Sequence, residues 1–237
     1  MKKIHWLLLL FLACLLFFSV DVAYAKKGTQ HVVPDTVADP HSKLTAKYES
    51  VHLDHCTAIL ISPTVALTAK HCGGDYKSSF NGTIYPGESG SSTPFGYMNV
   101  RVYIPHPTYD IALLKGTERD QSRAYKYYIK NFKTPVTGFS DRELYNIVSQ
   151  DVYAYGYPYK FSGYKQYRSD GSIYYYYKDK HFVHTSLPTY EGQSGSGAFL
   201  KDGRFIGIII TRTESYEGNF LPFTQDIANW INQHAKN

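Results

Sequence analysis

The sequence predicts an all-β fold, a sandwich or a barrel, followed by one C-terminal α-helix. The first observation behind this prediction is a series of short apolar, strand-like segments within residues 43–210. The second is the turn chemistry between them, because pairs such as Asn81-Gly82 and Asp202-Gly203 tolerate the positive φ angles of tight hairpins. The third is that few segments show a helical period. Many short strands with dense turns are typical of an all-β domain.

The expected strands have the sequences CTAILIS, TVALTA, MNVRVYI, DIALLK, DVYAYGY, GAFL and FIGIIIT, in chain order. The helix is expected over residues 224–237, where Thr224 can cap the N-terminus and Asp226 suits the positive end of the helix dipole. Apolar residues recur there at helical spacing, at Ile227, Trp230 and Ile231.

The N-terminal 25 residues have the order of a secretory signal peptide. Lysines at positions 2 and 3 precede an apolar run over residues 6–20, and an Ala-Tyr-Ala sequence at 23–25 supplies small residues around a cleavage site. The alternative is an uncleaved membrane anchor, but the apolar run is short for a membrane-spanning helix and no second candidate follows. We therefore expect a secreted, extracellular protein without a stable membrane anchor after cleavage.

The charge of the chain argues against one class of partner. The formal net charge is +5, and removing residues 1–25 deletes two lysines and one aspartate, which leaves +4. No block of Lys and Arg stands out in the rest of the sequence, so nucleic-acid binding is not supported.

Two cysteines, Cys56 and Cys72, remain after cleavage at residue 25. An even pair in an exported chain indicates a disulfide, with two free buried thiols as the alternative. Closing a loop of about 15 residues would stabilise the fold by roughly 3 kcal/mol in the chain-entropy model.

Two segments stand apart by composition. Residues 119–131, rich in Lys, Arg and Tyr, are expected to form an exposed connection between two halves of the protein. Residues 153–177 contain ten tyrosines. We interpret these as strand residues, because tyrosine has a high β propensity and suits half-buried faces. The alternative is a surface that contacts peptide, glycan or cell wall.

Three local signals for catalysis occur in chain order: His71 in LTAKHC, Asp110 in TYDIALLK and Ser194 in GQSGSG. Each also has an ordinary structural explanation, as a packed strand-end histidine, a turn aspartate and a glycine-rich loop. Together, in a predicted all-β chain, they indicate nucleophilic catalysis. Ser196 is a competing nucleophile in the same loop.

Acyl-transfer chemistry explains why these residue types are needed together. A serine hydroxyl is a poor nucleophile at neutral pH and needs an adjacent base, and imidazole can take that proton and return it to a leaving amine. A buried carboxylate fixes the tautomer of the imidazole and stabilises the imidazolium. Gly192 can present its backbone N–H, with that of Ser194, to a developing oxyanion. One such donor typically lowers the barrier by about 3 to 4 kcal/mol.

The regions that carry these residues resemble the signatures of chymotrypsin-like serine proteases. The resemblance lies in CTAILISPTVALTAKHC, YDIALLK and GQSGSGAF followed by GRFIGI, and it covers residues 32–233. The G-x-S-G-S pattern is similar to that of the bacterial glutamyl endopeptidase and exfoliative toxin branch. The resemblance implies a serine endopeptidase that acts on proteins or peptides, and its G-x-S-G alignment favours Ser194 over Ser196.

The same resemblance implies a domain organisation. Residues 32–120 would form one six-stranded antiparallel β-barrel and residues 121–223 a second, with the active site between them. His71 and Asp110 would come from the first barrel and Ser194 from the second. The cysteine pair resembles the bridge that brackets the catalytic histidine in this superfamily. Residues 26–31 are a candidate short prosegment, because the sequence at 32–34 resembles a mature start in the glutamyl branch.

Two positions depart from the family pattern. Gln193 stands where animal digestive proteases have an aspartate that pairs with the new N-terminal amine, so activation by that ion pair is not expected. Ile209 stands where the glutamyl branch has an S1 histidine, whereas Thr189 matches the S1 threonine of the branch and Arg212 can supply positive charge. Burying a substrate carboxylate without a donor is costly. Strict cleavage after glutamate is therefore not expected.

Other function classes remain as alternatives. One is a catalytically silent or highly selective secreted toxin or binding protein on the same fold. Another is an adhesin built around the tyrosine-rich segment. The remaining histidines do not form a spaced ligand set with cysteines or carboxylates, so no metal and no cofactor are expected. These histidines include His52, His55, His106, His181 and His184.

Overall fold

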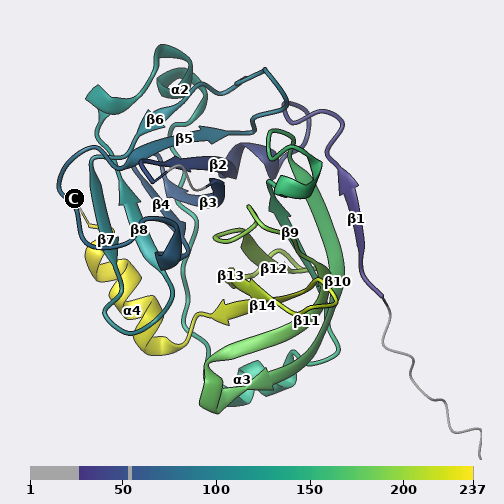
Figure 1. Ribbon diagram of the computed structural model, residues 1–237. Helices are drawn as coiled ribbons and strands as arrows, with labels where there is room; N and C mark the ends of the chain where they lie inside the picture. Colours follow the sequence, from purple (N-terminus) through teal and green to yellow (C-terminus); the bar gives the residue numbers. More distant parts are fainter. Residues whose placement is uncertain (1–26, 53–54, 237) are drawn as a thin grey trace, which may run out of the picture.

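The computed structural model describes residues 27–52 and 55–236. The predicted signal peptide, residues 1–25, lies outside them. Two antiparallel β-sheets lie side by side, and the C-terminal helix α4 (Gln225–His234) packs beside the first sheet (Figure 1). Among the described residues, no helix is both long and apolar enough to cross a membrane. The prediction of an all-β fold with one C-terminal helix is confirmed.

The first sheet is built from residues 45–115 and has the strand order β6-β5-β2-β3-β4-β8-β7. Its strands are β2 Thr45–Ser50, β3 His55–Ser62, β4 Val65–Thr68, β5 Gly82–Pro86, β6 Met98–Asn99, β7 Val102–Pro105 and β8 Ala112–Lys115. The two outer strands, β6 and β7, follow one another in the chain and are separated only by residues 100–101. Because this short connection must span from one edge to the other, the sheet has to curl.

The second sheet closes into a barrel. Strand β9 pairs with both β12 and β10, so the six strands β9 to β14 form a ring, and β1 adds to the outside of β10. The strands are β1 Thr29–Val32, β9 Asp151–Gly156, β10 Tyr167–Tyr177, β11 Phe182–Pro188, β12 Gly197–Leu200, β13 Phe205–Arg212 and β14 Glu217–Pro222. The arrangement fits the expected pair of barrels, with a curled seven-stranded sheet as the first. The sequence did not indicate that β1 would join the second barrel.

Strand β3 shows how the two halves share a hydrophobic core. Ala58 and Leu60 pack into the interior of the first sheet, whereas Ile59 and Ile61 pack into the core that continues into the second barrel. Successive strand residues point to opposite faces. A strand that is buried on both faces therefore needs the continuous apolar run seen in CTAILIS.

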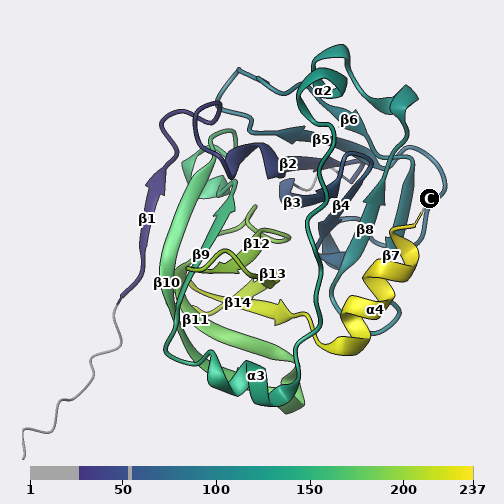
Figure 2. The same ribbon diagram turned by 180° about the vertical axis from the view of Figure 1, so that it is seen from behind.

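The connection between the halves differs from the prediction. Residues 119–131 are not simply exposed, because they contain helix α2 (Arg123–Tyr128), in which Tyr125 is fully buried. A second short helix, α3 (Asp141–Asn146), follows, and the chain between the two helices runs along the back of the molecule (Figure 2). Both helices have only six residues, too few for a helical period to stand out in the sequence.

Helix α4 begins after Thr224, as predicted, but the threonine does not cap a backbone N–H. Its hydroxyl instead donates to the carboxylate of Asp226. Trp230 packs edge-on against His106, with ring centroids 4.7 Å apart. The end of the chain thereby docks on the first sheet.

The tyrosine-rich segment is mainly strand, in agreement with our interpretation of it. Strands β9 and β10 contain most of its tyrosines. The buried ones are Tyr153, Tyr155, Tyr157 and Tyr176, and the exposed ones include Tyr159, Tyr164, Tyr175 and Tyr177.

Candidate active site

The three side chains predicted to act in catalysis come from three separate loops. His71 lies in a single 3-10 turn, Lys70–Cys72, directly after β4. Asp110 lies just before β8, and Ser194 lies in the loop that precedes β12. The fold brings all three to one place between the two halves of the protein.

His71 bridges the other two side chains. Its Nδ1 lies 2.8 Å from Asp110 Oδ2, and its Nε2 lies 2.9 Å from Ser194 Oγ. The backbone N–H of His71 also donates to Asp110 Oδ1 at 3.0 Å, so both carboxylate oxygens contact residue 71. With a proton on Nδ1, the imidazole presents the lone pair of Nε2 to the serine hydroxyl. Ser196 is fully buried, so the structure places Ser194 and not Ser196 beside the base.

The Asp110 side chain is held as a carboxylate. Burial raises its pKa, but the hydrogen bonds from the side chain and backbone of His71, together with charge attraction, outweigh burial. The pKa of Asp110 therefore lies below its ordinary value of 3.8. An ionised carboxylate at this position favours the protonated form of the imidazole.

His106 shapes the loop that carries Asp110. Its Nδ1 accepts the backbone N–H groups of Thr108 and Tyr109, each at 3.0 Å. Burial lowers the pKa of His106, which favours the neutral ring that can accept these bonds. No sequence pattern connects His106 with the site, because its partners there are backbone groups.

The predicted disulfide is confirmed. Cys56 on β3 is bonded to Cys72, the residue after the histidine, with a Cα–Cα distance of 6.2 Å. The bond links the 3-10 turn that carries His71 to the neighbouring strand β3. Cys56, His71 and Cys72 form the one cluster of potential metal ligands among the described residues. Both sulfurs are in the disulfide, so neither can bind a metal as a thiolate.

The backbone before Ser194 is oriented for an oxyanion. The carbonyl of Glu191 accepts the N–H of Tyr159 at 2.6 Å. Because the C=O and N–H of a trans peptide point in opposite directions, the N–H of Gly192 is turned away from Tyr159. Gly192 has φ +92°, and a side chain there would collide with the carbonyl of Tyr157. Within the described residues, the N–H groups of Gly192 and Ser194 have no protein acceptor, so both are available to a ligand.

Thr57 on β3 fastens this loop to the first half of the protein. Its N–H donates to the carbonyl of Ser194 and its Oγ1 to the carbonyl of Gly192, both at 2.8 Å. The same Oγ1 accepts the N–H of Tyr157 at 3.1 Å. Thr57 is fully buried. This role of Thr57 was not predicted, since a threonine in a strand carries no catalytic signature.

The hollow beside the nucleophile does not reach the predicted S1 residues. It has a volume of about 480 Å³ and is lined by His55, Cys56, His71, Cys72, Tyr159, Glu191, Gly192 and Ser194. Thr189 and Ile209 lie outside it and are only 4% and 1% exposed. Arg212 is half-buried and also lies outside it.

Aromatic and cationic side chains stand at the edge of this region. The rings of Tyr190 and Tyr216 lie 4.9 Å apart, and the guanidinium of Arg212 lies 4.6 Å from the ring of Tyr216. Arg212 also approaches the carboxylate of Glu191 at 3.5 Å, so its charge is partly matched within the protein. The ammonium group of Lys160 also lies close to this ring pair, with its Nζ 4.3 Å from the centre of the Tyr190 ring.

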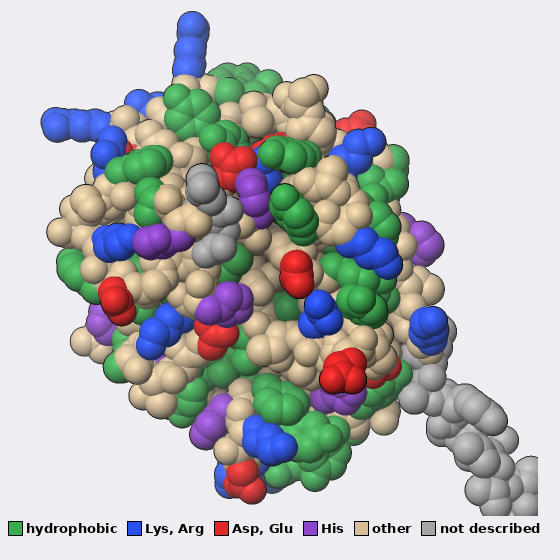
Figure 3. Space-filling view, viewed as in Figure 1, with side chains coloured by type: hydrophobic (Ala, Val, Ile, Leu, Met, Phe, Trp, Pro, Cys, Tyr) green, Lys and Arg blue, Asp and Glu red, His purple; other side chains and the backbone are tan. Residues whose placement is uncertain are grey.

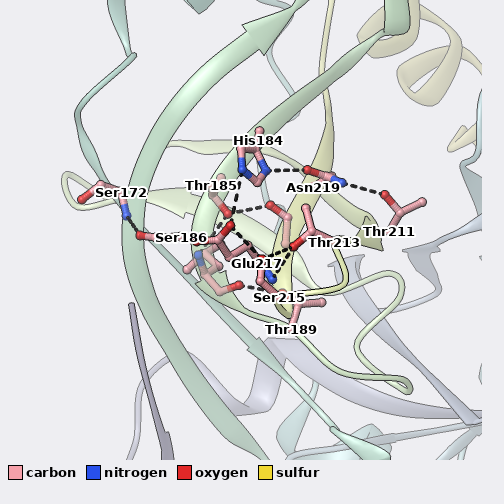
Figure 4. A network of polar contacts seen from close by, with 12 residues as sticks. Ser172, His184, Thr185, Ser186, Thr189, Thr211, Thr213, Ser215, Glu217 and Asn219 are labelled. Atoms are coloured by element: carbon pink, nitrogen blue, oxygen red, sulfur yellow. Dashed lines mark hydrogen bonds and ion pairs between the residues drawn. The ribbon is translucent and has the colours of Figure 1, made fainter. Parts of the chain in front are cut away.

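A network of polar side chains lies beside Thr189 on β11, β13 and β14 (Figure 4). His184 contacts Asn219 at 2.9 Å, and Asn219 donates to Thr211 at 3.0 Å. Thr189 itself donates its hydroxyl to the carbonyl of Leu187 at 3.1 Å. These contacts tie the strands together and hold the Thr189 hydroxyl in place, with its lone pairs left as acceptors. His184 thus acts as a strand residue that links β11 to β14.

The face of the molecule shown in Figure 3 carries cationic and anionic side chains interspersed over its surface, together with several histidines. Such mixed charge does not form the continuous basic stripe that backbone contacts to nucleic acid use.

Comparison with known proteins gives one family. The model of the trypsin-like peptidase domain matches residues 56–208. No curated protein matches the sequence.

Several solved structures have the same fold. A Glu endopeptidase in complex with MPD is 20% identical, with a TM-score of 0.70, and the match covers 89% of this chain and 98% of that one. The protease Anisep from Arthrobacter nicotinovorans is 14% identical, with a TM-score of 0.65, covering 87% and 99%. The thermostable serine protease AL20 from an extremophilic microorganism is 16% identical, with a TM-score of 0.63, covering 82% and 97%.

Proposed function

The chain belongs to the trypsin-like peptidase family, and on this premise we propose that it is a secreted serine endopeptidase that forms an acyl-enzyme on Ser194. One observation carries the proposal: His71 lies within hydrogen-bond distance of both the Ser194 hydroxyl and the Asp110 carboxylate. The donors for an oxyanion, the N–H groups of Gly192 and Ser194, lie on the same loop as the nucleophile.

The reaction begins with attack of Ser194 Oγ on the carbonyl carbon of the scissile peptide bond. His71 Nε2 takes the hydroxyl proton as the C–O bond forms, and Asp110 stabilises the resulting imidazolium. The carbonyl oxygen becomes an oxyanion and accepts hydrogen bonds from the N–H groups of Gly192 and Ser194.

The intermediate then collapses. The C–N bond breaks, and His71 returns its proton to the leaving amine, which leaves an ester on Ser194. A water molecule repeats the sequence: it gives a proton to His71 and attacks the ester carbon. The acid product departs, and the proton returns to Ser194.

Cleavage after glutamate is not expected to be strict. The apolar Ile209 offers no hydrogen bond to a substrate carboxylate, and Arg212 already contacts Glu191 and Tyr216. A broader or apolar preference at P1, the residue before the cleaved bond, is the stronger expectation, with an acidic preference through Arg212 as the alternative. A panel of peptides that differ only at P1 tests this. Strong selectivity for glutamate would show that the Ile209 argument is wrong.

The accessibility of the S1 region favours a second candidate function. Thr189 and Ile209 are buried and lie outside the hollow beside Ser194. A protein with this geometry would hydrolyse only substrates whose binding rearranges the S1 region, as in a highly selective toxin, or would bind without hydrolysis.

Labelling with an active-site phosphonate distinguishes these candidates. A serine peptidase becomes covalently modified at Ser194, and the modification disappears in Ser194→Ala, which also loses essentially all hydrolysis. A folded wild-type protein that resists labelling would rule out the acyl-enzyme mechanism. Hydrolysis of a single protein, with general peptides left intact, would support the selective form.

The proposal that the protein is secreted rests on the N-terminal sequence. Detection of the protein in the culture medium with residues 1–25 removed is the expected result. Retention of these residues in a membrane fraction would contradict secretion.

A further inference from the structure

The N-terminal strand β1 reaches the loop that carries the nucleophile. Gln30 pairs in register with Ser169 of β10, and its side chain points toward the start of that loop. Its Nε2 lies 2.7 Å from Ser169 Oγ, 3.1 Å from the carbonyl of Pro188 and 3.1 Å from Gln193 Oε1. One amide group thus lies within hydrogen-bond distance of both ends of the segment 188–193.

Gln193 precedes the nucleophile and is only 1% exposed. Its Oε1 also accepts the N–H of Tyr190 at 2.9 Å, and its Nε2 lies 3.5 Å from Ser169 Oγ. Ser169 in turn donates to the carbonyl of Pro188 at 2.7 Å. The side chain of Gln193 is therefore folded back under its own loop and held there by residues of β1 and β10.

The position of Gln193 connects this contact to catalysis. Its backbone lies between the two peptide groups whose N–H donors face the oxyanion, those of Gly192 and Ser194. Fixing its side chain restricts rotation of both peptide groups. Small changes in such orientation affect the rate strongly, because a displacement of about 1 Å can cost about 100-fold.

We propose that Gln30 is a positioning residue: the N-terminal strand stays in the active protein, and its neutral amide holds Gln193 so that the oxyanion donors face the cleft. This inference rests on the proposed function. It also places the mature N-terminus at or before residue 30, whereas the sequence analysis suggested a prosegment over residues 26–31. Because neither amide titrates, the contact is independent of pH.

The test compares substitutions at Gln30 in the full chain with one at His31, the next residue of β1, which is exposed. Gln30→Met keeps the length and volume of the side chain but removes its donors. We expect Gln30→Met and Gln30→Ala to lower kcat by about 10- to 100-fold with little change in KM. We expect no change in the shape of the pH profile. His31→Ala should stay within about twofold of wild type.

A second measurement separates positioning from folding. Inhibition by a peptide boronate, which mimics the tetrahedral intermediate, should weaken in Gln30→Met by the same factor as kcat/KM. Thermal unfolding identifies any variant that does not fold. A folded Gln30→Met protein with wild-type kcat and boronate affinity would overturn the proposal.

N-terminal sequencing of the active wild-type protein gives an independent test. The proposal requires that sequencing start at or before residue 30, and an active protein that starts later would overturn it. Phosphonate labelling of wild type separates this outcome from failure of the proposed function. Labelled wild type with an unaffected Gln30→Met variant contradicts the role of Gln30 alone, whereas unlabelled wild type contradicts the acyl-enzyme mechanism.

Discussion

The proposed base, His71, and the proposed nucleophile, Ser194, are held in different ways. His71 and Asp110 are fixed within the first sheet by neighbouring features: the Cys56–Cys72 disulfide and the hydrogen bonds that the loop makes to His106. The loop of Ser194 is fixed by segments that are distant in the sequence. Thr57 comes from the first half, 137 residues before Ser194, and Gln30 lies 163 residues before its partner Gln193.

From this difference we expect some substitutions to change mainly the free energy of unfolding and others to change mainly kcat. A covalent bond that closes a short loop acts chiefly on the unfolded chain, so its loss lowers stability. Stabilisation of an oxyanion depends on the orientation of its N–H donors. Loss of the hydrogen bonds that set this orientation should therefore lower kcat. Four variants test this contrast, and they follow in order of decreasing expected effect.

Asp110→Asn should have the largest effect. Asparagine keeps the shape of the side chain but favours the wrong tautomer of His71, so kcat should fall by about 10⁴. Steady-state kinetics on a peptide substrate measures this. A fall of less than tenfold would show that Asp110 does not orient the base.

Asp110→Asn also tests how the contacts between Asp110 and His71 contribute to stability. The pKa of Asp110 is depressed in the fold, so its ionised form adds stability at pH values above its ordinary value of 3.8. That contribution is lost as the pH falls through the lower pKa of the folded state. Denaturant unfolding of wild type and Asp110→Asn should therefore differ at neutral pH and converge in strong acid.

Removing the disulfide should mainly lower stability. The double variant Cys56→Ala/Cys72→Ala is expected to lose about 3 kcal/mol in the free energy of unfolding, because the unfolded chain regains the entropy of the loop. Denaturant titration with and without a reducing agent measures this. A variant as stable as wild type would contradict the view that the disulfide stabilises the part of the fold that carries His71.

Thr57→Val should lower kcat by about 10- to 100-fold, because it removes the hydroxyl that binds the carbonyl of Gly192 and leaves that group and the N–H of Tyr157 unpaired. Thr57→Ser keeps the hydroxyl and serves as the matched control, with kcat near wild type. Equal loss in both variants would assign the effect to packing. Unchanged kcat in Thr57→Val would show that the hydrogen bonds of the Thr57 hydroxyl are not needed for catalysis.

His106→Asn should have the smallest effect, seen in the pH dependence of stability. Burial lowers the pKa of His106, opposed by Asp226 and reinforced by Lys70 and His234. As the pH falls, His106 is therefore protonated in the unfolded chain before it is protonated in the folded protein. The free energy of unfolding consequently decreases below pH 6.5. Asparagine does not titrate, so the variant should lose less stability between pH 7 and pH 5. Water can replace the lost bond at the exposed Thr108, which keeps the effect small.

The class of fold, the C-terminal helix, the disulfide and the residues of the candidate site could all be predicted from the sequence. These features have signatures in the sequence: the apolar runs of CTAILIS and its neighbours, the turn residues, an even cysteine count and the motifs around His71, Asp110 and Ser194. The strand, turn and motif signals each depend on residues a few positions apart, whereas the disulfide was expected from the cysteine count of the exported chain.

The contacts that hold the Ser194 loop, and the side chains that a substrate can reach, follow from the tertiary structure. The partners of the Ser194 loop are backbone groups and neutral side chains, such as Thr57, Tyr159 and Gln30, whose residue types carry no signal of their role. Burial of Thr189 and Ile209 likewise comes from tertiary packing, in which the N–H of Thr189 donates to the carbonyl of Tyr216 and Ile209 pairs with Phe220 of β14. Contacts of this kind arise from pairing between distant segments, and a local pattern cannot encode them.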